Sequence, residues 1–187
     1  FLVDSQNNQV QVFKKGLFMG GKAIIVAGGD PQKSLWDEIE KGAKFAYRTL
    51  TYQGFTKETI YYLSADTNTE DLDNNGLFDD IDAVHTKENL EKAITEWAMD
   101  TDNLTLYLID HGGDQIFHLN DESDPAKSQV TAAELNGWLN TWQEHQPKGV
   151  LTFIYEACQS GSFIKTLAGQ NRILITSAAS QEKAALT

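Results

Sequence analysis

The stretch FIYEACQSGSF, residues 153–163, holds the only cysteine of the chain, Cys158. Apolar residues precede it and small polar residues follow it, a pattern typical of a buried strand that leads into a short helix. A second stretch, LYLIDHGG at 106–113, is also apolar and ends in His111 and two glycines. The rest of the chain must indicate whether Cys158 is a reactive thiol or a small core residue.

Strand and helix patterns alternate along the chain. We expect buried strands over residues 22–29, 59–65, 103–110, 149–157 and 172–178. Between them, helices are expected from Ser34 to Leu50, after Thr86, after the capping-box pair Thr131 and Glu134, and directly after Cys158. Residues 114–121 are expected to form a short extended excursion. This alternation predicts an α/β fold with a mostly parallel sheet and helices on both faces.

Composition limits the classes of function. The 187 residues suffice for one domain with its own core, and we expect 1–187 to be a single domain. A net charge of −12 argues against nucleic-acid binding. No apolar stretch approaches the roughly 20 residues of a membrane span. Because the chain starts at Phe1 and stops within SAASQEKAALT, we expect a mature form or a fragment with further C-terminal sequence.

Two strand ends carry reactive groups. If the strands at 103–110 and 149–157 are neighbours, about 5 Å apart, His111 comes close to Cys158. A nearby imidazole lowers the pKa of a thiol from about 8.5 and favours the nucleophilic thiolate. Gly112 has no side chain, so its N–H and that of Cys158 are candidates for an oxyanion hole. The alternative is a core cysteine and an unrelated surface histidine.

The two stretches LYLIDHGG and FIYEACQSGSF together resemble the legumain family and, more distantly, the caspases. The resemblance covers about residues 22–179 and implies a caspase–haemoglobinase-like three-layer sandwich. It also implies a cysteine endopeptidase that cleaves proteins or peptides through a thioester acyl-enzyme, and we expect a bacterial member. By this resemblance His111 is the general acid/base, Cys158 the nucleophile and Gly112 an oxyanion donor.

The same resemblance implies a specificity pocket. Glu156 matches the glutamate that lines the legumain pocket for the residue before the cut (P1), and Ser177 lies in a stretch that forms another wall. Legumains also place a basic pair on the first crossover, where this chain has Glu38 and Ile39. Two preferences therefore stay open: asparagine, or a basic side chain attracted by Glu156 and Asp110.

An acidic loop, DLDNNGLFDDID at 71–82, has the spacing of an EF-hand calcium loop and resembles dockerin-like bacterial loops. Gly76 allows the sharp turn. We expect structural Ca²⁺ and, because calcium is plentiful outside cells, an exported protein. The alternative is a solvated acidic loop. The expected ligands are Asp71, Asp73, Asn75, the carbonyl of Leu77, Asp79 and Asp82.

Two other functions use the same features. A catalytically inactive, calcium-stabilised scaffold would keep the fold, and a peptide ligase would use the same dyad with an amine in place of water. His85, following the acidic loop, is interpreted as a surface residue, and neither it nor His118 and His145 is assigned a function. The four tryptophans are expected in the core.

Overall fold

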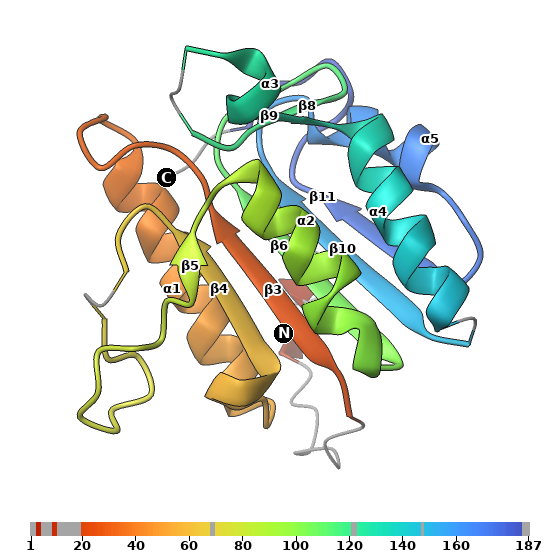
Figure 1. Cartoon of the computed structure of the whole chain (residues 1–187). Coiled ribbons are helices and arrows are strands. Elements are labelled where there is room, and N and C mark those ends of the chain that lie inside the picture. Colours follow the sequence, from red (N-terminus) through yellow and green to blue (C-terminus); the bar gives the residue numbers. More distant parts are fainter. Residues whose placement is uncertain are drawn as a thin grey trace.

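A computed structural model describes residues 20–67, 70–120, 123–146 and 148–184, with the backbone of 3–4 and 9–10. Its centre is a six-stranded sheet in the order β11-β10-β6-β3-β4-β5 (Figure 1). Every strand pairing in this sheet is parallel, which confirms the predicted α/β fold class. The strands are β3 (Lys22–Ala27), β4 (Ile60–Ser64), β5 (Ala83–Val84), β6 (Asn103–Ile109), β10 (Val150–Glu156) and β11 (Arg172–Thr176).

Five of these strands coincide with the expected segments, and the sixth was not predicted. The short strand β5 pairs with Leu63 and Ser64 at one edge of the sheet. Two residues carry no measurable periodicity, so the sequence pattern gave no signal for this strand. A separate hairpin, β1 (Val3–Asp4) with β2 (Gln9–Val10), lies near the N-terminus.

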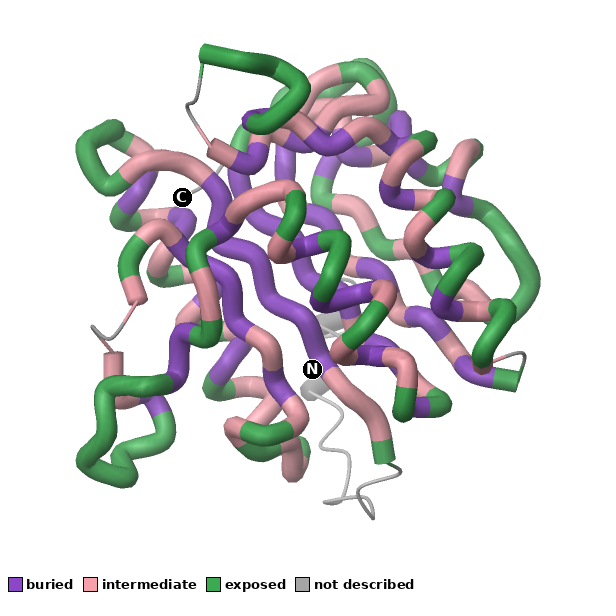
Figure 2. Tube along the Cα trace, viewed as in Figure 1, coloured by how far each residue is buried: buried purple, intermediate pink, exposed green. Residues whose placement is uncertain are grey.

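Helices cover both faces of the sheet and complete the expected three layers. Helix α1 (Trp36–Tyr52) packs on one face through Ile39, Ala43 and Tyr47. Helices α2 (Lys87–Thr95) and α4 (Ala132–His145) pack on the other face (Figure 1). The buried residues therefore follow the central strands and the inner side of each helix (Figure 2). None of the described helices is long and apolar enough to cross a membrane.

The helix starts follow local capping chemistry. The side chain of Thr86 accepts from the N–H of Asn89, and Thr131 and Glu134 form the predicted capping box. Helix α1 begins at Trp36 and not at Ser34. Its N-cap residue is Leu35, whose side chain makes no capping hydrogen bond. The remaining helical turns are η1 (Lys57–Thr59), η2 (Trp97–Asp100), α3 (Pro125–Ser128), η3 (Ser160–Phe163) and α5 (Ile164–Leu167).

A small antiparallel sheet forms directly after β6. It consists of β7 (Gly112–Gly113), β8 (Ile116–His118) and β9 (Gln129–Thr131), in that order. Strand β8 lies in the excursion expected at 114–121. The small sheet lies at the end of the large sheet where β6 finishes (Figure 1), so it borders the region where the two reactive strand ends meet.

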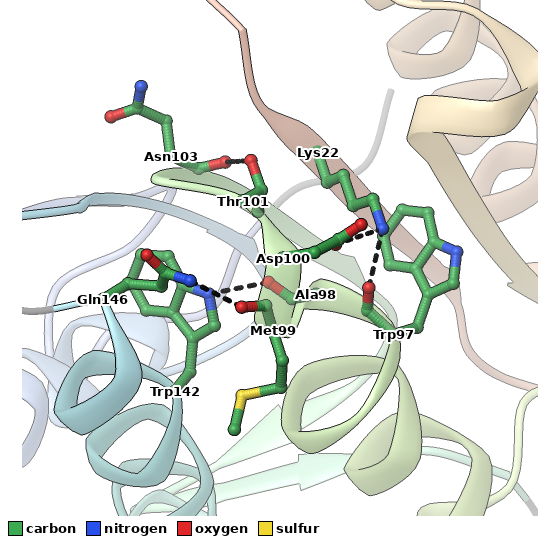
Figure 3. Close-up of polar contacts among 9 residues, drawn as sticks. All are labelled: Lys22, Trp97, Ala98, Met99, Asp100, Thr101, Asn103, Trp142 and Gln146. Atoms are coloured by element: carbon green, nitrogen blue, oxygen red, sulfur yellow. Dashed lines mark hydrogen bonds and ion pairs between the residues drawn. The ribbon is translucent and has the colours of Figure 1, made fainter.

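The opposite, amino-terminal end of the sheet is held by polar contacts (Figure 3). Trp142 Nε1 on α4 donates to the carbonyl of Ala98 in η2, at 3.0 Å. Lys22 Nζ at the start of β3 donates to the carbonyl of Trp97 at 2.7 Å and lies over the Trp97 ring. These contacts attach both α4 and β3 to η2, at the end of the sheet opposite the reactive strand ends.

Candidate active site

His111 and Cys158 follow neighbouring parallel strands. The register of β6 and β10 pairs Ile109 with Glu156, and each reactive residue comes two positions later in the chain. Beyond the last pair, the N–H of Asp110 still donates to the carbonyl of Glu156, at 3.3 Å. The expected neighbour relationship of these strands is thus present. His111 is exposed, and Cys158 is partly buried.

Gly112 lies against the backbone of the nucleophile candidate. A Cβ atom at this position would come within 2.4 Å of the carbonyl oxygen of Cys158 and 2.7 Å of the Tyr155 hydroxyl. Real Cβ atoms do not approach other atoms so closely, so the position requires glycine. The residue after the histidine therefore touches the residue proposed to attack the substrate.

The loop after His111 is tied to the turn after Cys158. The N–H of Gln115 donates to Ser162 Oγ at 2.9 Å, and its side-chain oxygen accepts from Thr166 Oγ1 at 2.6 Å. The Tyr155 hydroxyl donates to the carbonyl of Ile116 at 3.2 Å. The sequence did not predict these contacts of Gln115 and Tyr155, because a glutamine in a turn and an aromatic residue in a strand carry no signal for such roles.

The segment after β11 runs past the thiol. Gln159, directly after Cys158, has a positive φ of 56°, and its N–H donates to the carbonyl of Glu182 at 2.7 Å. The Cys158 thiol lies 3.9 Å from the carbonyl oxygen of Ala184. A non-glycine residue with positive φ is uncommon and costs free energy, so this turn is held in place by its surroundings.

Glu156 and Ser177 lie at the ends of the neighbouring strands β10 and β11. Glu156 pairs with Ile109, whose side chain belongs to the α1 face of the core, so Glu156 is on that face too. Burial raises the pKa of its carboxyl group, and a hydrogen bond from the Tyr107 hydroxyl opposes this rise. Ser177 is exposed, and its Oγ accepts from the N–H of Ala157 at 3.2 Å.

Asp110 is placed differently from the expectation. It is only 3% exposed and packs against the turn after β3. A Cβ atom on Gly28 would lie 2.6 Å from Asp110 Oδ2. This location favours a supporting role beneath the catalytic edge over contact with a substrate side chain.

The acidic loop groups a different set of carboxylates from the expected one. Oxygens of Asp71, Asp73 and Asp80 lie within 4.8 Å of one another, so Asp80, which was not predicted, lies next to two of the expected ligands. Asp80 is fully buried and accepts from the Tyr47 hydroxyl and the N–H of Leu72. Of the other expected ligands, Leu77 and Asp79 are exposed, and Asp82 pairs with Lys57 and accepts from the N–H of Tyr62.

Asn75 stays with this group. Its N–H donates to Asp71 Oδ1 and Asp73 Oδ1, both at 3.0 Å, and its side-chain oxygen accepts from the N–H of Leu77 at 2.7 Å. Asn74 and Gly76 have positive φ values of 61° and 88°, which fold the loop tightly around these oxygens. Three carboxylates that converge in this way suit a hard cation such as Ca²⁺.

Comparison with known protein families identifies the family of the chain. Residues 83–186 match the family described as the Peptidase C13 family. This match covers more than half of the chain and includes both reactive strand ends. The comparison with curated proteins gave no match. On the family match and the parallel three-layer fold together, the chain belongs to the Peptidase C13 family, the legumain family of cysteine peptidases with a caspase-like fold.

Proposed function

We propose that this chain is a cysteine endopeptidase in which Cys158 is the nucleophile and His111 the general acid/base. The observation that carries the proposal is the contact of Gly112 with the Cys158 backbone at the ends of two paired strands. This contact places Gly112, the neighbour of His111, against Cys158. The N–H groups of Gly112 and Cys158 then donate hydrogen bonds to the same substrate oxygen.

The reaction follows from these groups. The Cys158 thiolate forms a bond to the scissile carbonyl carbon, and the negative charge on the oxygen is held by the backbone N–H donors. His111 gives a proton to the leaving amine as the C–N bond breaks, which leaves a thioester. Water then attacks the thioester, His111 takes its proton, and the bond to sulfur breaks to regenerate the thiolate.

For the residue before the cut, we propose a basic side chain, with asparagine as the second candidate. Glu156 is partly buried, and burial opposes its ionised form. A lysine or arginine in contact with the carboxylate offsets that cost by Coulomb attraction. Asparagine can only hydrogen-bond to it. The exposed Ser177 beside Glu156 offers a further polar contact to either side chain.

The dyad is tested with peptide amides of aminomethylcoumarin that differ only at P1, together with labelling by a peptidyl acyloxymethyl ketone. Cys158→Ala is expected to abolish cleavage, and His111→Ala to abolish cleavage and slow the labelling. His145→Ala is the matched control, because His145 is an exposed histidine at the end of α4. Cleavage that survives Cys158→Ala would refute the assignment.

The same experiments separate the alternatives. Labelling of Cys158 no faster than that of a free thiol, without cleavage, would favour an inactive scaffold. Transfer of the acyl group to an added amino-acid amide, in preference to water, would favour a ligase. Hydrolysis at a rate independent of added amine would support the endopeptidase.

We further propose that the loop at 71–82 binds structural Ca²⁺ through Asp71, Asp73 and Asp80, and that the protein is exported to a calcium-rich compartment. The three converging carboxylates support this, because they repel one another without a cation. The loop lies beside η1 and the start of β4, through the Asp82–Lys57 pair, so calcium would stabilise the fold without entering the chemistry. Calcium should raise Tm and EDTA should lower it; no shift with either would contradict the proposal.

A further inference from the structure

A pocket of about 350 Å³ lies at the carboxyl ends of β3, β4 and β5, apart from the residues assigned above. It collects residues from four separated parts of the chain. Gly29 and Asp30 follow β3, Ala65 follows β4, His85 and Thr86 follow β5, and Asn120 follows β8. No single sequence motif contains these residues, so only the folded chain reveals the pocket.

The pocket lies on the leaving-group side of the proposed dyad. Along the carboxyl end of the sheet the strand order places Cys158 after β10, His111 after β6, and the pocket after β3 and its neighbours β4 and β5. The acyl part of a substrate is bonded to Cys158, and the leaving amine is next to His111. A substrate chain that continues beyond His111, away from Cys158, therefore runs toward the pocket.

Backbone contacts connect His111 to the pocket wall. The N–H of His118 donates to the carbonyl of His111 at 3.1 Å, and Asn120 comes two residues after His118. Two residues of extended chain span roughly 7 Å. The pocket is thus within reach of the first few substrate residues after the scissile bond.

The pocket chemistry favours a cation that donates hydrogen bonds. His85 is only 5% exposed; its Nε2 donates to the carbonyl of Gly29 at 2.7 Å and its Nδ1 is buried, so the ring forms part of the pocket wall. Burial lowers the pKa of His85 and so favours the neutral ring. Among the lining residues, Asp30 therefore carries the charge, and Asp66 is close enough to act on His85 electrostatically.

The walls also suit the aliphatic stem of a long side chain. Pro31 is exposed and Val84 is 42% exposed, and both line the pocket. Lysine and arginine bury their methylene groups on such apolar surface while their charged ends reach a carboxylate. The pocket thus combines an apolar wall, a carboxylate and neutral polar groups.

We propose that this pocket binds a lysine or arginine side chain of the substrate, within three residues after the scissile bond. This proposal rests on the peptidase function proposed above and adds a second determinant of specificity, on the leaving-group side. The expectation that His85 is a surface residue was wrong. It is a buried residue of the pocket wall, because β5 pairs with β4 and the His85 N–H donates to the carbonyl of Ser64.

The test uses internally quenched peptides with one fixed acyl half. The leaving-group half carries lysine or its neutral analogue norleucine, in turn at the first, second and third position after the cut. The wild-type protein should cleave the best lysine peptide with a kcat/KM about three- to tenfold above that of its norleucine counterpart. The Asp30→Asn variant should reduce this ratio to about one.

Two controls isolate the pocket. Asp102→Asn removes one exposed carboxylate at the opposite end of β6, so it should keep the lysine preference and account for any effect of net charge. An aminomethylcoumarin amide has no amino-acid residue after the cut. Wild-type cleavage of this amide without a lysine preference in the quenched peptides would overturn the pocket proposal alone, as would equal losses in Asp30→Asn and Asp102→Asn. Failure to cleave any substrate would overturn the peptidase function, and the pocket proposal with it.

Discussion

Gly112 touches Cys158 so closely that a Cβ atom at position 112 would lie 2.4 Å from the Cys158 carbonyl oxygen. The neighbouring glycine is in a different position. At Gly113 the nearest atom to an added Cβ would be Gln159 Oε1, at 3.9 Å, which is ordinary contact. Adjacent glycines in the same loop therefore differ in how much space they have.

This difference predicts opposite outcomes for two alanine variants. Gly112→Ala must push the loop away from Cys158 and displace an oxyanion donor, so we expect kcat to fall by about 100-fold or more. Gly113→Ala should stay within about threefold of wild type, because the added methyl group meets no backbone. Equal activity of the two variants in the coumarin assay, with thermal unfolding as the folding check, would refute the role of Gly112.

If Glu156 binds a basic P1 residue, as proposed, the preference for that residue should depend on pH. Burial raises its pKa, so the carboxylate takes up a proton at a higher pH than an ordinary glutamate. As the pH falls from neutral toward that raised pKa, the kcat/KM ratio of arginine to asparagine substrates should decline. The ratio in Glu156→Gln should be low and independent of pH over the same range, and an unchanged preference in this variant would exclude Glu156 from the pocket.

The raised pKa of Glu156 also predicts how the stability of the folded chain depends on pH. Because its pKa is raised in the folded state, the folded chain binds more protons than the unfolded chain between the two pKa values. Stability contributed by this group is present below the unfolded pKa and is lost as the pH rises through the folded pKa. Glu156→Gln should therefore slightly raise Tm at pH 7 and not at pH 4, and a lower Tm at pH 7 would contradict this account.

Asp80 and Asp79 are adjacent carboxylates with contrasting surroundings. Asp80 is fully buried and accepts from the Tyr47 hydroxyl and the Leu72 N–H, whereas Asp79 is exposed. Asp80→Asn should lower the free energy of unfolding by about 1–3 kcal/mol, and Asp79→Asn by less than about 0.5 kcal/mol. Urea unfolding measures both changes.

Repeating the unfolding experiment with calcium distinguishes the two ligand sets. If Asp80 is a ligand, Asp80→Asn should lose most of the stabilisation by calcium and Asp79→Asn should keep it. The reverse result would favour the EF-hand spacing predicted from the sequence over the arrangement in the structure.

Gly137 offers a test of the helical part of the fold. It lies within α4, and a Cβ atom added there would have no atom within 4 Å. Alanine loses less conformational entropy in a helix than glycine, so Gly137→Ala should stabilise the protein by about 0.5–1 kcal/mol. Destabilisation in a urea titration would show that the residue packs against something or is not helical.

The local signals in the sequence were strong for the helices and strands. Apolar runs located five of the six strands of the main sheet, and Thr86 and Thr131 with Glu134 located two helix starts. These signals act over a few residues, because periodic burial and capping depend on near neighbours in the chain. The sequence could propose Gly112 and Cys158 as site residues for the same reason, because each follows an apolar run.

What the tertiary structure decided is which separate segments meet. An apolar run indicates that a strand is buried but does not specify its neighbours, so the place of β6 between β3 and β10 and the addition of β5 came from the fold. The direction of a carboxylate depends on the turns beside it, which is why Asp80 and not Asp82 joins Asp71. His85 lines a pocket because four distant segments close around it, and such long-range contacts leave no periodic trace in the sequence.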